Sequence, residues 1–125
     1  MKATLKNYRQ APRKVRLVAD LIRGKAVSSA RTTLTFLPKK AAHQMRKLVD
    51  SAVANAREKG VTNIDDLVIK RIQVDRGFTF TRYRARSRGR ALPIRKQSSH
   101  IALELGEQVK KSKKENVKTK KETKV

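Results

Sequence analysis

Five arginines stand at every second position between residues 82 and 90, separated by mostly small residues: Arg82, Arg84, Arg86, Arg88 and Arg90. A guanidinium group keeps its charge and offers N–H donors in a fork that fits phosphate oxygens, and its plane stacks on bases. Because side chains alternate between two faces in an extended strand, this spacing predicts a cationic face along a β-ribbon. Tyr83, on the other face, adds a possible stacking surface for a base.

Residues that could support catalysis are few and scattered, with two histidines and no cysteine. We expect His43 to be a surface residue near a helix start. His100 follows two serines, an arrangement that suggests a nucleophile and a base, but a hydrogen-bonding residue at a strand start is the favoured interpretation. The adjacent Asp65 and Asp66 are typical of a turn, and no phosphate loop, dinucleotide fingerprint or zinc spacing is present. The sequence therefore predicts a protein that is not an enzyme and holds no metal or cofactor.

The charge of the chain points to a polyanionic partner. Among 125 residues, 33 are Lys or Arg and 10 are Asp or Glu, a formal net charge of +23. Repulsion among so many like charges destabilises a compact chain unless a polyanion neutralises them. Nucleic acid is the leading candidate, because each cation that binds a phosphate releases condensed counterions and so strengthens binding. No apolar stretch approaches the roughly 20 residues of a membrane span, and the N-terminus lacks the apolar segment of a signal peptide. We expect a cytoplasmic protein in an assembly, with no membrane partner and no homo-oligomer.

Three other groups of cations accompany the arginine run. Lys14, Arg16, Arg23 and Lys25 flank the first predicted helix with few acids nearby, which favours phosphate contact. Arg95 and Lys96 follow the run along the returning strand and are predicted to bind the same partner. The lysine-rich segment 110–124 is equally compatible with a solvating tail and with a loose nucleic-acid contact.

Hydrophobic periodicity predicts three helices and a first edge strand. A strand is expected from Ala3 to Tyr8. The first helix begins at Pro12 and ends at Gly24, with one apolar face: Val15, Val18, Ala19 and Ile22. A second helix carries Val27, Ala30, Leu34 and Leu37 and ends at Pro38, although its threonines are poor helix formers. A third covers residues 39–59 and stops at Gly60, with a continuous stripe: Ala41, Met45, Leu48, Val49, Ala52, Val53 and Ala56.

The period then changes from 3.6 to 2, which predicts strands on both sides of the arginine run. Val68, Ile72 and Val74 share one face, interrupted by Lys70, and Ile101, Leu103 and Leu105 share another. A hairpin with its tip at residues 88–89 would place Ile72 opposite Leu105, Val74 opposite Leu103 and Arg76 opposite Ile101. Apolar faces then meet, which argues against a disordered arginine-rich stretch. Pro93 predicts a break or bulge in the returning strand.

These elements define an α+β fold of three helices on a small antiparallel sheet with a long projecting β-hairpin. We expect residues 1–106 to form a single domain, with the hairpin at about residues 76–100. Residues 107–125 are predicted to be a disordered, lysine-rich tail, because so few apolar residues cannot offset chain entropy. A two-stranded ribbon is marginal in water alone, so the arm is expected to become ordered when a partner packs on it.

Three motifs in order resemble those of a known family, the universal large-subunit ribosomal protein numbered twenty-two, of bacterial type. Residues 11–25 resemble its first-helix motif, and residues 52–56 resemble the end of its long helix. Residues 86–91, followed by the segment 98–101, resemble its hairpin signature. The chain departs from the family pattern at four hairpin positions: Ala85, Ser87, Pro93 and Gln97. The resemblance covers the chain up to about Leu105.

The resemblance implies a protein that binds large-subunit ribosomal RNA and aids early subunit assembly beside neighbouring ribosomal proteins. It also implies that the hairpin lines the nascent-peptide exit tunnel, in contact with the passing peptide, through the tip residues Arg86, Ser87, Arg88, Gly89, Arg90 and Ala91. The predicted RNA-binding residues are Lys14, Arg16, Arg23, Lys25, Arg82, Arg84, Arg86, Arg88, Arg90, Arg95 and Lys96.

Two other functions fit parts of the sequence. An architectural DNA-binding protein could place a basic β-arm in the minor groove, with Pro93 as an intercalating wedge; the three motifs argue against it. An RNA-cleaving enzyme would need a base or metal constellation that the chain does not offer.

Overall fold

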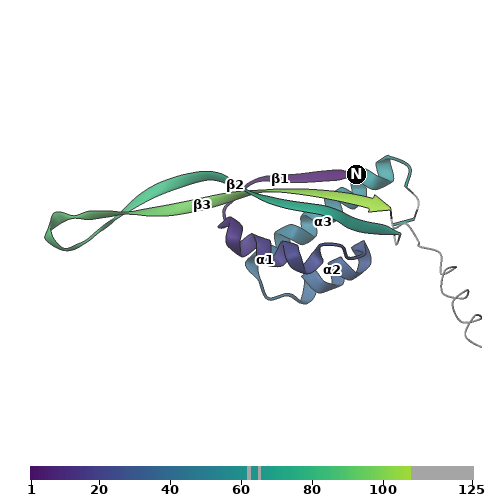
Figure 1. Ribbon diagram of the computed structural model, residues 1–125, viewed down its shortest axis with the longest axis horizontal. Coiled ribbons are helices and arrows are strands. Elements are labelled where there is room, and N and C mark those ends of the chain that lie inside the picture. Colours follow the sequence, from purple (N-terminus) through teal and green to yellow (C-terminus); the bar gives the residue numbers. More distant parts are fainter. Residues whose placement is uncertain (62, 65, 108–125) are drawn as a thin grey trace, which may run out of the picture.

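The computed structural model describes residues 1–61, 63–64 and 66–107 (Figure 1). Three helices, α1 (Pro12–Ile22), α2 (Val27–Phe36) and α3 (Lys40–Glu58), follow the first strand, β1 (Lys2–Tyr8). Two long strands, β2 (Leu67–Ala85) and β3 (Ala91–Glu107), are joined by a short 3₁₀ turn, η1 (Ser87–Gly89). The sheet has the order β1-β3-β2 and is antiparallel throughout. The predicted α+β class is confirmed; the predicted tail beyond Glu107, and Asp65, lie outside the described residues.

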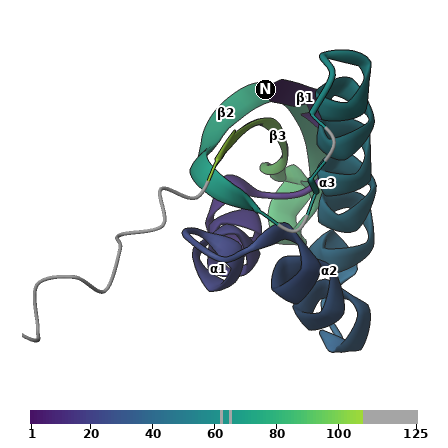
Figure 2. The ribbon, with the colours of Figure 1, turned by 90° about the vertical axis from the view of Figure 1, so that its right-hand side faces the viewer.

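The helices gather against the base of the hairpin, and the distal half of the hairpin extends well beyond them (Figure 1). Helix α3 packs along β1, α1 packs against β2, and α2 packs beside α3 (Figure 2). Only the base of the hairpin therefore contributes to the body of the protein.

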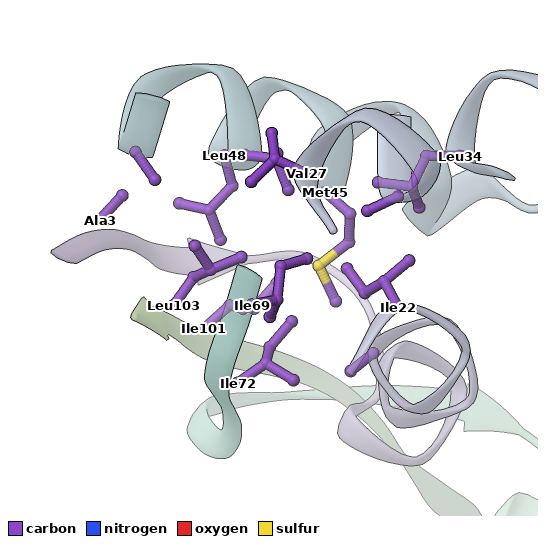
Figure 3. Close-up of a cluster of buried hydrophobic side chains, with 14 of the residues drawn as sticks. Ala3, Ile22, Val27, Leu34, Met45, Leu48, Ile69, Ile72, Ile101 and Leu103 are labelled. Atoms are coloured by element: carbon purple, nitrogen blue, oxygen red, sulfur yellow. The ribbon is translucent and has the colours of Figure 1, made fainter. Parts of the chain in front are cut away.

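The core is aliphatic and follows the predicted helical faces. All four predicted residues of α1 are buried, as is the whole predicted stripe of α3. Figure 3 shows Met45 of α3 reaching between Ile22 of α1 and Ile69 of β2, where its flexible thioether fills the space between the helices and the sheet. Helix propensity and burial thus agree for α1 and α3, which explains why their sequences predicted them well.

Helix α2 forms despite its threonines because their hydroxyls find partners within the helix. Thr32, Thr33 and Thr35 donate to carbonyl oxygens four residues earlier, at 3.2, 2.9 and 2.9 Å. These bonds let β-branched polar residues sit on an exposed face while Val27, Ala30 and Leu34 are buried.

The predicted glycine stops of α1 and α3 are confirmed as well. Gly24 and Gly60 follow these helices in the left-handed conformation, at φ 75° and 82°.

The predicted strand register was wrong by two residues. Ile72 pairs with Leu103, Val74 with Ile101 and Arg76 with Ser99. One residue of the shift arises because the turn is centred on Arg88, and the other because β2 carries an extra residue between Arg76 and Thr79. Since two residues are one full period of a strand, Ile72 and Val74 still meet apolar partners on the core face.

A second irregularity corrects the predicted core face of β2. The register also shifts between Ile69 and Arg71, where Lys70 is the extra residue. This bulge changes the phase of alternation, so that Leu67 and Ile69 are buried before it and Ile72 and Val74 after it. Val68, predicted to lie on the core face, is only half-buried.

The predicted break at Pro93 is also wrong. Strand β3 runs without interruption from Ala91 to Glu107, and Pro93 pairs with Tyr83. Each strand of a two-stranded ribbon has one free edge, where a residue without an N–H is tolerated. The irregularities lie in β2 instead, at Lys70 and at Gly77-Phe78.

Candidate nucleic-acid interface

The distal hairpin, residues 79–97, is a two-stranded arm that is almost entirely exposed. Beyond the Arg76–Ser99 pair the ladder continues from Thr79–Gln97 to Ala85–Ala91, and every residue from 80 to 96 is exposed. The sequence has no acidic residue between Arg76 and Leu103. The arm therefore projects positive charge with nothing along its own length to neutralise it.

The tip corrects the expectation that five arginines line one face. Strand alternation holds for Arg82 and Arg84, but β2 ends at Ala85 and the chain reverses through η1. The Arg86 N–H donates to the Arg90 carbonyl at 2.8 Å, and Arg88 takes the left-handed conformation with φ 56° and ψ 39°. Arg86, Arg88 and Arg90 thus surround a turn instead of continuing a row.

Cross-strand pairing shows what the two faces of the arm carry. Directly paired residues point to the same face of a sheet. One face therefore combines cations with exposed apolar groups: Phe80, Arg82, Arg84, Leu92, Ile94 and Lys96. The other carries one cation among small and neutral residues: Thr81, Tyr83, Ala85, Ala91, Pro93 and Arg95.

A cleft of about 550 Å³ lies where the arm meets the helical body. Six cations line this root cleft, and none of its lining residues is acidic: Arg9, Lys14, Lys40, Arg82, Arg95 and Lys96. Both α1 and α3 begin here, with no acidic residue in the first turn of either helix, so the partial positive charge of two helix ends adds to the potential. The root cleft is built to attract an anion.

Four of the predicted RNA-binding residues meet in this cleft: Lys14, Arg82, Arg95 and Lys96. Arg9 and Lys40 were missed, because they lie in separate parts of the sequence and join this group of cations only when β1 and α3 pack at the arm root. Nearby, the Tyr8 hydroxyl donates to Gln10 Oε1 at 2.8 Å, and partial burial raises the pKa of this phenol.

Aromatic rings accompany the cations at the arm root. The Arg9 guanidinium lies over the Phe80 ring, 5.6 Å from its centroid. The ring of Phe78 meets that of Phe80 edge to face, with centroids 4.8 Å apart. Such cation–π and edge-to-face contacts fix the orientation of both rings while leaving them accessible to a partner.

Arg16 and Arg23 have a second task that the sequence did not reveal. Arg16 donates from Nε and Nη2 to the Val74 carbonyl at 3.2 and 3.0 Å. Arg23 donates to the Ile72 carbonyl at 3.3 Å and pairs with Asp20 at 2.8 Å. Because β2 is an edge strand, these bonds satisfy outward carbonyls and fasten α1 to the sheet. Both side chains stay exposed, as does that of Lys25.

Hydrogen bonds from β3 fix the junction between arm and body. The buried Ser98 and Ser99 donate to the carbonyls of Phe78 and Gln10, at 2.6 and 2.5 Å. His100 Nδ1 accepts the Asn7 N–H at 3.0 Å, where β1 bulges and Asn7 is left-handed at φ 56°. The predicted hydrogen-bonding role of His100 is confirmed, although it lies within β3 and not at its start. His43 is exposed near the start of α3, as predicted.

Within the described ranges 1–61, 63–64 and 66–107, no three His, Asp or Glu side chains gather as metal ligands would. No helix among these residues is both long and apolar enough to cross a membrane.

An exposed basic arm on a small α+β body, with an acid-free cleft at its root, is the surface expected of a protein with a polyanionic partner. The chain belongs to the family described as ribosomal protein L22p/L17e, whose model matches residues 3–106. This membership confirms the resemblance of the three motifs. It also agrees with the prediction that the chain is not an enzyme.

Several curated relatives are similar over most of the chain, and each is named large ribosomal subunit protein uL22. The protein of Bdellovibrio bacteriovorus is 51% identical over 107 residues, which cover 86% of this chain and 97% of that protein. That of Pelobacter propionicus is 49% identical, covering 84% and 95% of the two chains. That of Syntrophotalea carbinolica is 50% identical, covering 85% and 96%.

Proposed function

We propose that this protein is a structural constituent of the large ribosomal subunit in the cytoplasm, where it binds large-subunit ribosomal RNA and aids early assembly. Family membership and the names of the relatives support the setting. The observation that carries the RNA-binding role is the arm itself: a long, exposed ribbon without one acidic side chain, opening at its root into a cleft lined by six cations. We treat residues 1–106 as one functional domain.

The predicted RNA contacts divide into three groups by their place in the fold. Lys14, Arg82, Arg95 and Lys96 act together in the root cleft. Arg84 and the three turn arginines act along the distal arm. Arg16, Arg23 and Lys25 act along α1, where Arg16 and Arg23 use only those N–H groups that are not committed to β2. Contacts of this kind neutralise phosphate and fix orientation without reading base sequence.

We further propose that the arm reaches along the nascent-peptide exit tunnel and that its tip, residues 86–91, faces the passing peptide. An exposed two-stranded ribbon gains stability when RNA packs along it, and the three-residue turn η1 closes its tip. The protein acts as a single copy among neighbouring ribosomal proteins.

RNA binding is tested by comparing affinity for large-subunit ribosomal RNA with affinity for duplex DNA over a salt series. We expect tighter binding to the RNA at every salt concentration. Each lost phosphate contact lowers the slope of log affinity against log salt by roughly 0.7–0.9. Replacing Arg82 and Arg95 by Gln should lower that slope, whereas replacing Arg57 and Lys59, at the far end of α3, should change it little. Equal affinity for duplex DNA would favour an architectural DNA-binding function instead.

Tunnel placement is tested with a photo-crosslinking amino acid at Ser87 in ribosomes that carry a labelled nascent chain. We expect adducts between the nascent chain and position 87, and none from the same group placed at Thr32 on the exposed face of α2. An absence of adducts from position 87 in ribosomes that contain the protein would refute the placement of the tip.

A further inference from the structure

The aromatic residues of this protein are distributed in an unusual way. All three phenylalanines lie outside the core, with Phe36 80%, Phe78 66% and Phe80 39% exposed. Phenylalanine is ordinarily among the most buried residues, and exposing its ring forfeits a large hydrophobic gain. The aliphatic core accounts for none of the three, so their position calls for a partner. Two of them meet at the arm root.

The surroundings of Phe80 indicate what that partner is. Its ring lines the root cleft together with Arg9, whose guanidinium lies 5.6 Å from the ring centroid. The volume of about 550 Å³ falls within the roughly 300–1,000 Å³ of sites that hold one small molecule, and it is far too small for a double helix. Unpaired RNA bases stack on aromatic rings and on arginine planes. A flat group with attached phosphates matches this combination of ring, guanidinium and lysines.

The position of Phe80 is fixed by the irregularity in β2. The extra residue between Arg76 and Thr79 re-aims this part of the strand, and the Ser98 hydroxyl donates to the Phe78 carbonyl at 2.6 Å. The neighbouring ring of Phe78 meets Phe80 edge to face. Bulges commonly re-aim a side chain toward a functional site. The ring is thus oriented before any ligand arrives.

We propose that the root cleft binds one unpaired nucleotide of an RNA strand. Its base packs against Phe80 and the guanidinium of Arg9, and its flanking phosphates lie against Lys14, Lys40 and Lys96. This site deepens the proposed function and rests on it: the cations of the arm hold RNA of any sequence, whereas the root cleft selects a point where a base leaves the helix. Recognition is then by shape and stacking.

The experiment uses the full chain and two RNA hairpins that differ only in one extra, unpaired 4-thiouridine in the stem. We expect the hairpin with the unpaired base to bind about tenfold more tightly, the scale of one base stacked on an aromatic side chain. Near-ultraviolet irradiation should then cross-link the thio-base to the tryptic peptide of residues 77–82, which contains Phe80.

Variants assign the effect to the ring. Phe80→Ala should reduce the preference for the hairpin with the unpaired base to within about twofold, because affinity for that hairpin falls far more than affinity for the fully paired one. Phe36→Ala is the control, because it removes a still more exposed ring from α2, away from the root cleft, and should leave the preference intact. Arg9→Gln should reduce the preference in part. Circular dichroism confirms that each variant keeps its helices.

The outcomes separate the two proposals. If the full chain prefers large-subunit RNA to duplex DNA but binds both hairpins equally, the nucleotide site is refuted and the proposed function stands. A cross-link to the peptide that contains Phe36, or an equal loss in the two phenylalanine variants, also refutes the site. If duplex DNA binds as well as RNA, both proposals fail.

Discussion

Replacing Gly77 by alanine tests whether the junction between arm and body is as tightly built as its contacts indicate. A methyl group at this position would lie 2.6 Å from Ser98 Oγ and 3.0 Å from His100 Nε2. Neither neighbour can simply turn away. The serine hydroxyl is bonded to the Phe78 carbonyl, and the histidine ring accepts the Asn7 N–H on its other nitrogen.

The magnitude follows from three effects. Forcing a methyl group into a filled site costs about 1–3 kcal/mol. Displacing the Ser98 hydroxyl loses a hydrogen bond worth about 0.5–1.5 kcal/mol. Alanine restricts the unfolded chain more than glycine does, which returns about 0.4–1 kcal/mol. We therefore expect Gly77→Ala to lower the free energy of unfolding by about 0.5–4 kcal/mol, with a central value of about 2 kcal/mol, a large part of the roughly 5–15 kcal/mol of a typical domain.

The assay is urea unfolding of the RNA-free protein, followed by the circular dichroism of its helices. Gly106→Ala is the matched control, because its methyl group would lie 3.3 Å from the flexible Lys70 side chain, which can move. We expect that control to change stability by less than about 0.5 kcal/mol. In a Ser98→Ala background the closest contact is gone, so Gly77→Ala should cost about 1 kcal/mol less there than in the natural chain.

Two results would refute this reasoning. If Gly77→Ala lowers the free energy of unfolding no more than Gly106→Ala does, the junction between arm and body accommodates a methyl group and is not rigidly packed. If the cost of Gly77→Ala is the same with and without the Ser98 hydroxyl, the clash lies elsewhere and the contact with Ser98 is not its cause.

Three further predictions concern the body and the tip. Arg16→Ala should lower the free energy of unfolding by about 1–2 kcal/mol through its lost bonds to β2. Arg13→Ala, at an exposed position of the same helix, should change it by less than about 0.5 kcal/mol; equal unfolding midpoints for the two variants would contradict this. Arg88→Gly should raise the thermal stability of the free protein, because glycine adopts the left-handed conformation without strain; an unchanged or lower melting temperature would count against it. The pKa of Glu104 is lowered by its hydrogen bond from Lys2 and by the positive charge of Lys2. The ion pair therefore stabilises the fold at neutral pH, and this stabilisation is lost as the pH falls below the ordinary pKa of 4.5. Lys2→Ala should lower the melting temperature at pH 7 and not at pH 3; an equal effect at both pH values would show that the ion pair does not contribute to stability.

Repulsion among its cations and the exposure of its apolar groups explain why the arm needs a partner. Without RNA, seven cations from Arg82 to Lys96 lie along a ribbon with no acidic residue, so they repel one another. Binding RNA removes this repulsion and packs against the exposed apolar groups of the cationic face. The contacts of Gly77 and Ser98 at the junction then set the direction in which the arm leaves the body.

The sequence by itself determined the helices, the charge and the family. The apolar stripe of α3 and the face of α1 predicted their burial correctly, because helix periodicity depends only on residues three and four apart. The pairing of two apolar strand faces predicted a hairpin, and the motif at residues 86–91 placed its tip. Four of the six cations of the root cleft were identified as part of a general basic surface.

Only the tertiary structure decided the register, the cleft and the second role of Arg16 and Arg23. The bulges at Lys70 and Gly77 arise from contacts across the sheet, and the local sequence does not reveal which residue will be left without an opposite partner. Arg9 and Lys40 join the root cleft because β1 and α3 pack beside the arm. Arg16 docks on a backbone carbonyl 58 residues away, and backbone groups have the same chemistry at every position. Local patterns therefore determine which elements form, whereas long-range packing determines which of their atoms meet.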